Sequence, residues 1–147
     1  MRDTAELKSD PELMRLIAEI QPPFAGLLGG KVIFVSREKI VAELPVRDEL
    51  GNRNGVMHGG AIMAFADILG GAATCINLPK GAGTTTIESK TNFFAAIQPG
   101  DVARAECTPL HRGRSTMVWQ TRITRGDGKL AAMVTQTQMV IPAPKAG

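Results

Sequence analysis

The sequence contains few of the residues that mark several classes of protein. It has 147 residues, of which two are cysteine, two are histidine, one is tryptophan and none is tyrosine. Cys75 and Cys107 lack CxxC spacing and have no neighbouring histidine, so we interpret both as small core residues. The two histidines are far apart in the sequence, which argues against a metal site. The basic residues are scattered and aromatic residues are scarce, which argues against nucleic-acid binding despite a net charge of +3.

Long hydrophobic runs are also absent. The most apolar stretch, residues 59–76, contains four glycines and is interrupted by Asp67, so it falls short of the roughly 20 uninterrupted apolar residues that a membrane span needs. The composition, 44% hydrophobic and 21% charged, is typical of one compact domain. Residues 1–6 are charged and lack the apolar core of a secretory signal, so we expect a cytoplasmic protein with no membrane partner.

The hydrophobic pattern predicts a helix, two strands, a long helix and four more strands. The first helix begins near Ser9, which has capping-box spacing to Glu12, and ends before Pro22. A long helix is predicted from His58 to Ile76, with its apolar side chains recurring at helical spacing. Strands are predicted at residues 31–35, 39–46, 83–96, 102–110, 115–124 and 129–141.

This order indicates an α+β fold in which an antiparallel sheet wraps around one helix. We expect the domain to span residues 24–141, after an N-terminal segment of residues 1–23 and before a frayed tail of residues 142–147.

The start of the long helix carries groups suited to acyl transfer. Asn52 lies in the polar loop that leads into His58-Gly59-Gly60. In the first turn of a helix the backbone N–H groups lack intrahelical partners and the helix dipole is positive. The amides of Gly59 and Gly60 could therefore bind a developing oxyanion. His58 and Asn52 could supply further hydrogen bonds.

Asp67 is the one acidic residue in this otherwise uncharged helix. We expect its carboxylate to be buried and therefore to need a partner or a chemical role. Nine residues of helix separate it from His58 by about 13.5 Å along the axis and by about 180° around it. One chain cannot bring the two together, so a shared site requires a twofold interface between subunits. The pair Gly70-Gly71 lowers helix propensity, which suggests that another group approaches this backbone closely.

A purely structural interpretation of the same residues stays open. His58-Gly59-Gly60 can be only an N-cap and a tight turn, and Asp67 can cap a neighbouring loop.

With these residues considered together, the chain resembles the hot-dog fold acyl-CoA thioesterases of the group that includes the phenylacetate-degradation thioesterase. The resemblance covers about residues 24–141. It is carried by Asn52, by His58-Gly59-Gly60, by Asp67 nine positions after the histidine and by the strand Thr84-Thr85-Thr86-Ile87-Glu88-Ser89-Lys90-Thr91-Asn92-Phe93-Phe94. The turn Pro99-Gly100-Asp101 and the segment Arg112-Gly113-Arg114 also match.

The resemblance implies roles for these residues. Asp67 would act as general base or nucleophile on a thioester, and the Gly59 amide would polarise its carbonyl group. Asn52 and His58 would position the thioester or the attacking water. A hydroxyl from the following strand, Thr86 or alternatively Thr85, would assist Asp67. The resemblance also implies a homotetramer of two dimers, whereas the residues alone support at least a dimer.

Substrate contacts are less sharply indicated. Coenzyme A carries phosphates, so Arg53, Arg112 and Arg114 are candidate contacts for it. Met57 and Met63 can line an acyl pocket or simply fill the core. A thioester is reactive enough for a carboxylate, water and oxyanion donors to suffice, so no cofactor is expected. Two other functions stay open: hydration or dehydration of acyl thioesters with a histidine as acid and base, and acyl-CoA binding without hydrolysis.

Overall fold

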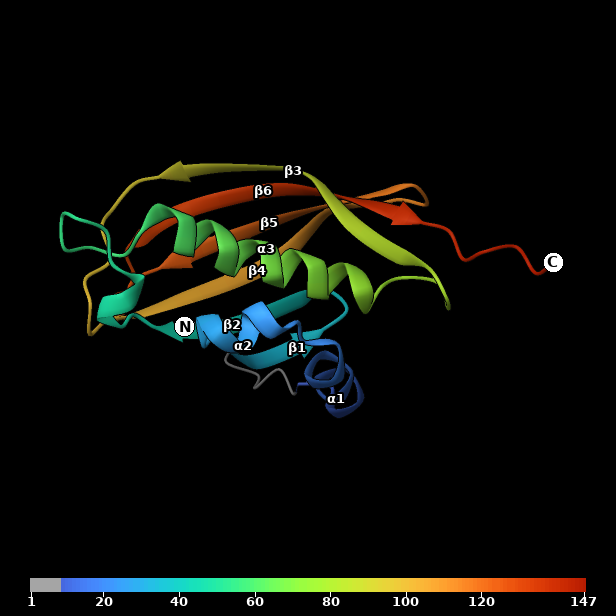
Figure 1. Cartoon of the computed structure of the whole chain (residues 1–147), viewed down its shortest axis with the longest axis horizontal. Helices are drawn as coiled ribbons and strands as arrows, with labels where there is room; N and C mark the ends of the chain where they lie inside the picture. The colour runs from blue at the N-terminus through green and yellow to red at the C-terminus, as the bar shows by residue number, and fades with distance from the viewer. Residues whose placement is uncertain (1–8) are drawn as a thin grey trace, which may run out of the picture.

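The structure is a computed structural model that describes residues 9–147. A six-stranded antiparallel sheet carries one long helix, α3, across one face, and the two short helices α1 and α2 lie at one side of it (Figure 1). The elements in chain order are α1 (Pro11–Ile20), α2 (Pro23–Leu28), β1 (Lys31–Ser36), β2 (Lys39–Pro45), the 3-10 helix η1 (Asp48–Leu50), α3 (Gly59–Cys75), β3 (Gly83–Phe93), β4 (Val102–Arg112), β5 (Thr116–Thr124) and β6 (Leu130–Ile141). The predicted α+β architecture is confirmed. The expectation for residues 1–6 lies outside the described residues.

The order of strands across the sheet is β1-β2-β4-β5-β6-β3, and every neighbouring pair is antiparallel. This order places β3 at one edge, paired on one side only with β6. An edge strand presents a row of backbone N–H and C=O groups to whatever lies beside it. The position of β3 therefore matters for the site described below.

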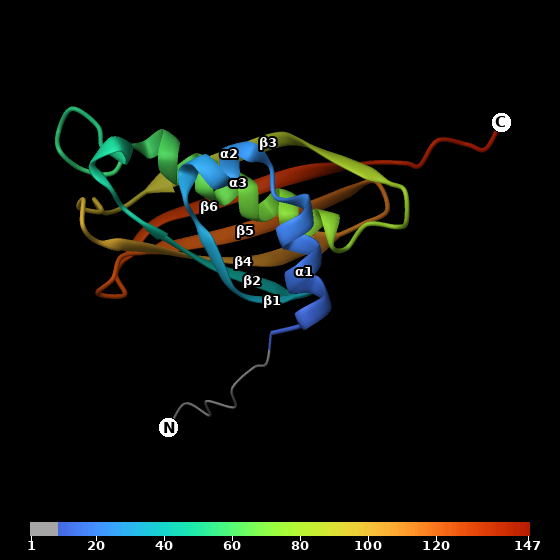
Figure 2. The ribbon, with the colours of Figure 1, turned by 60° about the horizontal axis from the view of Figure 1, so that its bottom comes forward.

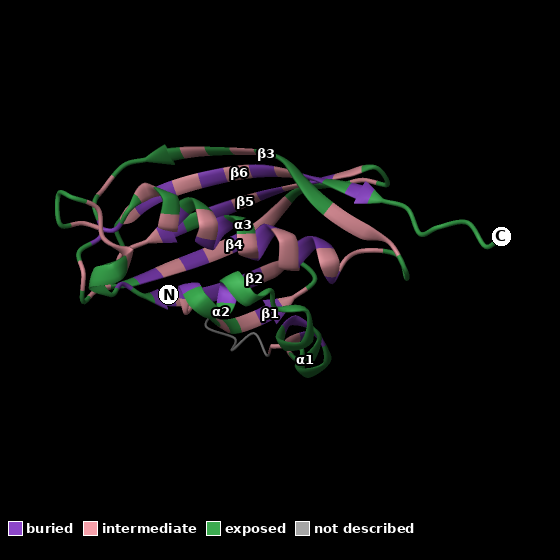
Figure 3. Ribbon diagram, viewed as in Figure 1, coloured by how far each residue is buried: buried purple, intermediate pink, exposed green. Residues whose placement is uncertain are grey.

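Helix α3 packs on the sheet through the apolar stripe predicted from its spacing. Its buried side chains are Ile62, Phe65, Ala66, Leu69, Ala73 and Thr74. On the facing strand β5, Met117, Trp119, Thr121 and Ile123 alternate as buried residues, as the sequence predicted. The Trp119 indole N–H donates to Thr74 Oγ1 over 2.8 Å, so the one polar atom of this large ring is satisfied. Figure 3 shows the buried residues along the sheet and on the face of α3 that meets it.

The N-terminal helices differ from expectation in two details. Asp10, rather than Ser9, caps α1, because its carboxylate accepts from the N–H groups of Glu12 and Leu13. Ser9 instead exchanges hydrogen bonds with the backbone of Val35 in β1. Helix α2 was not predicted, since its six residues are too few to show a period. Figure 2 shows both helices beside β1, with α2 next to α3.

The two cysteines are not bonded to each other. Cys107 is buried in the sheet, as expected of a core residue, and burial raises the pKa of its thiol to about 11. Cys75 is only half-buried, which differs from the expected core position, and burial raises the pKa of its thiol as well. Within residues 9–147, none of the helices is long and apolar enough to cross a membrane.

Candidate active site

The first turn of α3 leaves one backbone amide open. His58 is the N-cap residue, and its Nδ1 accepts a hydrogen bond from the Gly60 N–H over 2.8 Å. The Gly59 N–H finds no acceptor among residues 9–147. A Cβ atom added at Gly59 would lie 3.1 Å from the ring of Phe93 at the end of β3. Of the two amides predicted as oxyanion donors, Gly60 therefore serves the cap, and Gly59 is the one that can donate to a ligand.

The hydrogen bond at the N-cap also determines the tautomer of a neutral His58. Because Nδ1 accepts from the Gly60 N–H, a neutral His58 carries its proton on Nε2. The ring is exposed, so Nε2 can donate a hydrogen bond outwards.

The loop before His58 is shaped by Asn52. The Oδ1 atom of Asn52 accepts from the N–H groups of Asn54 and Val56, over 2.9 and 3.3 Å. This leaves the Asn52 amide nitrogen without a partner among the described residues. Met57, predicted as a pocket residue, is buried in the core and its N–H donates to Ile97. The loop thus ends in the exposed imidazole of His58, next in the chain to the open Gly59 N–H.

Asp67 lies farther along α3, away from the first turn of the helix, and no hydrogen bond joins it to His58. Its Oδ1 accepts from Thr86 Oγ1 over 2.8 Å and from Gln136 Nε2 over 3.1 Å. No donor among residues 9–147 reaches its Oδ2. The expectation that Asp67 is buried is wrong for the single chain, where the residue is exposed. It sits on the side of α3 that turns towards β3 instead of towards the core.

The register of β3 places Thr86, and not Thr85, against Asp67. Thr86 pairs with Gln138 of β6, and the register shifts before Glu88, so Ile87 is an extra residue in β3. A bulge of this kind redirects the neighbouring side chains and is common beside active sites. Thr86 also accepts from Gln138 Nε2 over 2.7 Å. Its own hydroxyl hydrogen is therefore directed at the Asp67 carboxylate.

Two glutamines on β6 were missed by the sequence analysis. Gln136 and Gln138 are both 1% exposed, and they hold Asp67 directly and through Thr86. Gln136 Oε1 is buried without a hydrogen-bond partner among the described residues. A buried oxygen without a hydrogen-bond partner lowers the free energy of unfolding by about 1–3 kcal/mol. The bond to Asp67 therefore orients the Gln136 amide at a cost in stability. The signal in the sequence was two polar residues at inward positions of an alternating strand.

The close approach predicted at Gly70-Gly71 is confirmed at Gly70. A Cβ atom there would lie 2.2 to 2.5 Å from the Gln136 side-chain amide. At Gly71, a Cβ atom would meet nothing within 4 Å in this chain. Gly70 therefore gives Gln136 the room to pass across α3 and reach Asp67.

This packing predicts a coupled pair. Gly70→Ala should destabilise the fold by about 1–3 kcal/mol through overpacking against Gln136, measured by urea unfolding. The matched control Gly71→Ala should stabilise it by up to about 1 kcal/mol through helix propensity. Adding Gln136→Ala to Gly70→Ala should recover much of the lost stability. If the changes in unfolding free energy caused by the two substitutions simply added, the position of the Gln136 side chain would not depend on Gly70.

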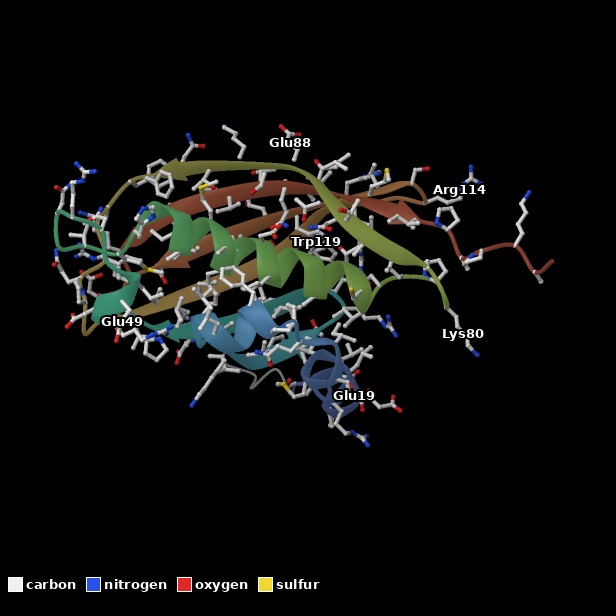
Figure 4. The ribbon with its side chains drawn as sticks, in the orientation of Figure 1. Glu19, Glu49, Lys80, Glu88, Arg114 and Trp119 are labelled. Atoms are coloured by element: carbon white, nitrogen blue, oxygen red, sulfur yellow. The ribbon has the colours of Figure 1, made fainter. Side chains whose placement is uncertain are left out.

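Two of the three predicted arginine contacts lie together, because Arg112 and Arg114 line one small pocket. The guanidinium of Arg112 binds Glu38 over 2.6 Å and also donates to the carbonyl of Arg37 and to Asn77. Arg114, at the β4–β5 turn, lies at the end of the molecule opposite Glu49 and the loop of Arg53 (Figure 4). Within one chain, the loop of Arg53 therefore lies apart from the pocket of Arg112 and Arg114.

Asp67 and Thr86 stand in the wall of a cavity of about 780 Å³. This volume is within the range of small-molecule sites. The cavity is bounded by α1, α2, α3, the start of β1 and residues 84–86 of β3. No group of three or more His, Cys, Asp or Glu side chains in residues 9–147 is arranged to hold a metal ion. The wall therefore offers a carboxylate and a hydroxyl group to a ligand in the cavity.

The chain is similar to several known proteins in sequence and in fold. Residues 54–132 match the family model described as the thioesterase superfamily. The structure of a mutant of thioesterase PA1618 from Pseudomonas aeruginosa superposes with a TM-score of 0.82 at 27% identity, covering 92% of this chain and 97% of that one. The sequence of PA1618, described as a putative esterase, is 29% identical over 143 residues, which is 95% of this chain and 97% of PA1618.

Two further structures are informative. A thioesterase-fold protein of Streptococcus pneumoniae, solved with coenzyme A, is 25% identical and has a TM-score of 0.72, covering 80% of this chain and 89% of that one. The PaaI protein from the phenylacetic acid degradation operon of Escherichia coli has a TM-score of 0.80 over 90% of this chain and 93% of its own, at 21% identity. The second likeness concerns the fold alone.

Proposed function

The chain belongs to the thioesterase superfamily, and from this membership we propose that it hydrolyses acyl-CoA thioesters to a free acid and coenzyme A. The observation that carries the proposal is the state of Asp67. One carboxylate oxygen is held by Thr86 and Gln136, while the other receives no donor from the described residues and belongs to a side chain in the wall of a cavity. A carboxylate held in this way can act on a bound thioester.

The reaction needs a base or nucleophile and an oxyanion site. As base, Asp67 Oδ2 would take a proton from water while the water oxygen bonds to the thioester carbon; as nucleophile, it would bond to that carbon itself. On the base route, the C–S bond then breaks and the proton on Asp67 passes to the leaving thiolate. On the nucleophile route, the C–S bond breaks and leaves the acyl group on Asp67 as a mixed anhydride; water hydrolyses this anhydride to the free acid, and the proton released goes to the thiolate. The Gly59 N–H at the positive end of α3 would stabilise the negative charge on the carbonyl oxygen. The Nε2–H of His58 and the Asn52 amide would hold the substrate or the attacking water.

Two copies of the chain are needed to bring these parts together. Along β3, Thr86 lies beside Asp67 and Phe93 lies beside Gly59. If two β3 edges pair antiparallel about a twofold axis between Ser89 and Lys90, residue 86 of one copy faces residue 93 of the other. Asp67 of one copy then faces the Gly59 N–H of the second.

The exposed edge of β3 supports this pairing. Ile87, Phe93 and Phe94 are 56%, 52% and 59% exposed there, and a long edge strand with apolar side chains favours pairing with another chain. We expect this dimer to be the catalytic unit, within the homotetramer that the family resemblance implies. No residue-level argument in the chain favours the hydratase or the non-catalytic alternative.

The proposal is tested with a panel of acyl-CoA thioesters. We expect the wild-type protein to release free coenzyme A and the corresponding acid, measured by chromatography and mass spectrometry. Enoyl-CoA substrates in the panel test for hydration, which would give a hydroxyacyl-CoA without free coenzyme A. Hydration without release, or binding with no turnover of any thioester, would contradict the proposed hydrolysis.

A further inference from the structure

The cavity beside Asp67 is apolar over most of its wall. The apolar part is formed by side chains of α1, α2 and α3, among them Ile17, Ile20, Phe24, Leu28, Phe65 and Ile68. Polar side chains gather beside Asp67, where the lining residues are Thr84, Thr85, Thr86 and Gln138, and two further polar residues, Gln21 and Lys31, line the cavity at the end of α1 and the start of β1. A wall divided in this way suits a ligand with an apolar body and one polar group.

Some of these apolar side chains are left exposed in the single chain. Ile20 is 38% exposed and Phe24 is 53% exposed, although both line the cavity. Leu13 and Ile17 of α1 are buried and anchor that helix. A ligand inside the cavity would cover Ile20 and Phe24 and gain from their removal from water.

The cavity is also long. Its lining on α3 runs from Phe65 to Cys75, which is about 15 Å of helix. Asp67 lies near one end of this stretch, and Cys75 lies at the other. A flexible chain that starts at Asp67 can follow the whole length, whereas a single ring fills only part of it.

We propose that this cavity binds the acyl chain of the substrate and that the preferred acyl group is an unbranched aliphatic chain of medium or greater length. The inference rests on the proposed function, because it places the thioester at Asp67. The chain then runs along α3, beneath α1 and α2. These two helices precede the residues that match the family model, so the match does not itself define this wall.

The first test is the dependence of hydrolysis on chain length. For wild-type protein, kcat/KM should rise from acetyl-CoA to dodecanoyl-CoA by up to about fourfold for each buried methylene. Ala18 lines the cavity, and Ala18→Phe should reduce hydrolysis of dodecanoyl-CoA at least tenfold more than that of acetyl-CoA. The adjacent Glu19 lies on the same helix but does not line the cavity (Figure 4), so the matched control Glu19→Phe should keep the wild-type profile.

A second variant, with its substitution on α3, controls for the possibility that Ala18→Phe disturbs the folding of α1. Gly71 lines the cavity and has open space at its Cβ position, so Gly71→Leu should fill the cavity from α3 without weakening that helix. It should shift the profile in the same direction as Ala18→Phe. A flat chain-length profile, a preference for phenylacetyl-CoA over decanoyl-CoA, or equal losses for short and long substrates would overturn the proposal. Loss of oligomeric state in Gly71→Leu would show instead that a second copy occupies this face.

The second test measures binding without turnover. Cys75 lines the far end of the cavity, and Cys107 is buried, so a maleimide should label Cys75 selectively. In Asp67→Asn protein, dodecanoyl-CoA should slow this labelling at least tenfold, whereas acetyl-CoA should not. If dodecanoyl-CoA did not slow the labelling of Cys75, the proposal that the acyl chain occupies this cavity would be overturned. If wild-type protein hydrolyses no thioester but dodecanoyl-CoA still protects Cys75, the proposed hydrolysis is wrong and the acyl-chain cavity is supported. If hydrolysis depends on Asp67 but Cys75 is not protected, the hydrolysis is supported and the acyl-chain cavity is wrong.

Discussion

Asp67→Asn is expected to lower kcat for acyl-CoA hydrolysis by about 10²- to 10⁴-fold and to leave KM nearly unchanged. Asparagine has the shape of aspartate, and its carbonyl oxygen can still accept from Thr86 and Gln136. The amide nitrogen that replaces Oδ2 can neither take a proton from water nor attack the thioester. The loss should therefore appear in the chemical step, measured as steady-state release of coenzyme A across a range of substrate concentrations.

The matched control is the same substitution at an aspartate outside the site. Asp127 is exposed in the β5–β6 turn, where the guanidinium of Arg125 lowers the pKa of its carboxyl to about 2. Asp127→Asn should affect only that turn and leave kcat at its wild-type value. If Asp67→Asn folded normally and retained wild-type kcat, the carboxylate would have no part in the reaction.

The elements of the fold that could be predicted are those with a clear period. Helix α3 repeats its apolar residues over 17 positions, and the strand β5 alternates strictly, so both were placed within a residue or two of their ends. Helix α2 has only six residues between Pro22 and Gly29 and no repeated turn from which a period could be seen. The cap of α1 shifted by one residue because Ser9 and Asp10 are both good N-caps, and only the fold shows that Ser9 is bonded to Val35.

The site could be predicted in part for a similar reason. A single acid on an apolar helix identified Asp67, and a histidine before two glycines identified the helix start. Exposure of Asp67 could not be predicted, because it depends on how α3 is rotated over the sheet. Gln136 and Gln138 approach from a strand far later in the chain, and their contacts with Asp67 depend on the β3–β6 register.

The cavity depends on tertiary structure even more strongly. Its wall combines α1 and α2 with the far side of α3 and with three threonines of β3. No local pattern in the sequence relates these segments. Met57 and Met63 were considered either as pocket residues or as core filler; neither lines the cavity, and Met57 is buried in the core. Of the residues predicted for the site, only Asp67, Thr85 and Thr86 line the cavity.

Gly59→Pro is expected to lower kcat by about 10²- to 10³-fold by removing one oxyanion donor. Proline has no backbone N–H, and Gly59 is the first residue of α3, where proline is well tolerated. His58 has φ −65° and ψ 135°, the extended conformation that a residue before proline prefers. The substitution therefore removes the N–H with little change to the helix, which circular dichroism and thermal unfolding can verify.

The control for Gly59→Pro is Gly59→Ala, which brings a Cβ atom against Phe93 but keeps the N–H. If the donor matters, alanine should retain most of the activity that proline loses; equal losses would assign the effect to crowding at Phe93. Co-expression of Gly59→Pro and Asp67→Asn chains then tests the twofold site. A mixed dimer has one site with both wild-type groups, so random assembly should restore about one quarter of wild-type activity. A site within one chain would give no recovery, because every chain carries one defect.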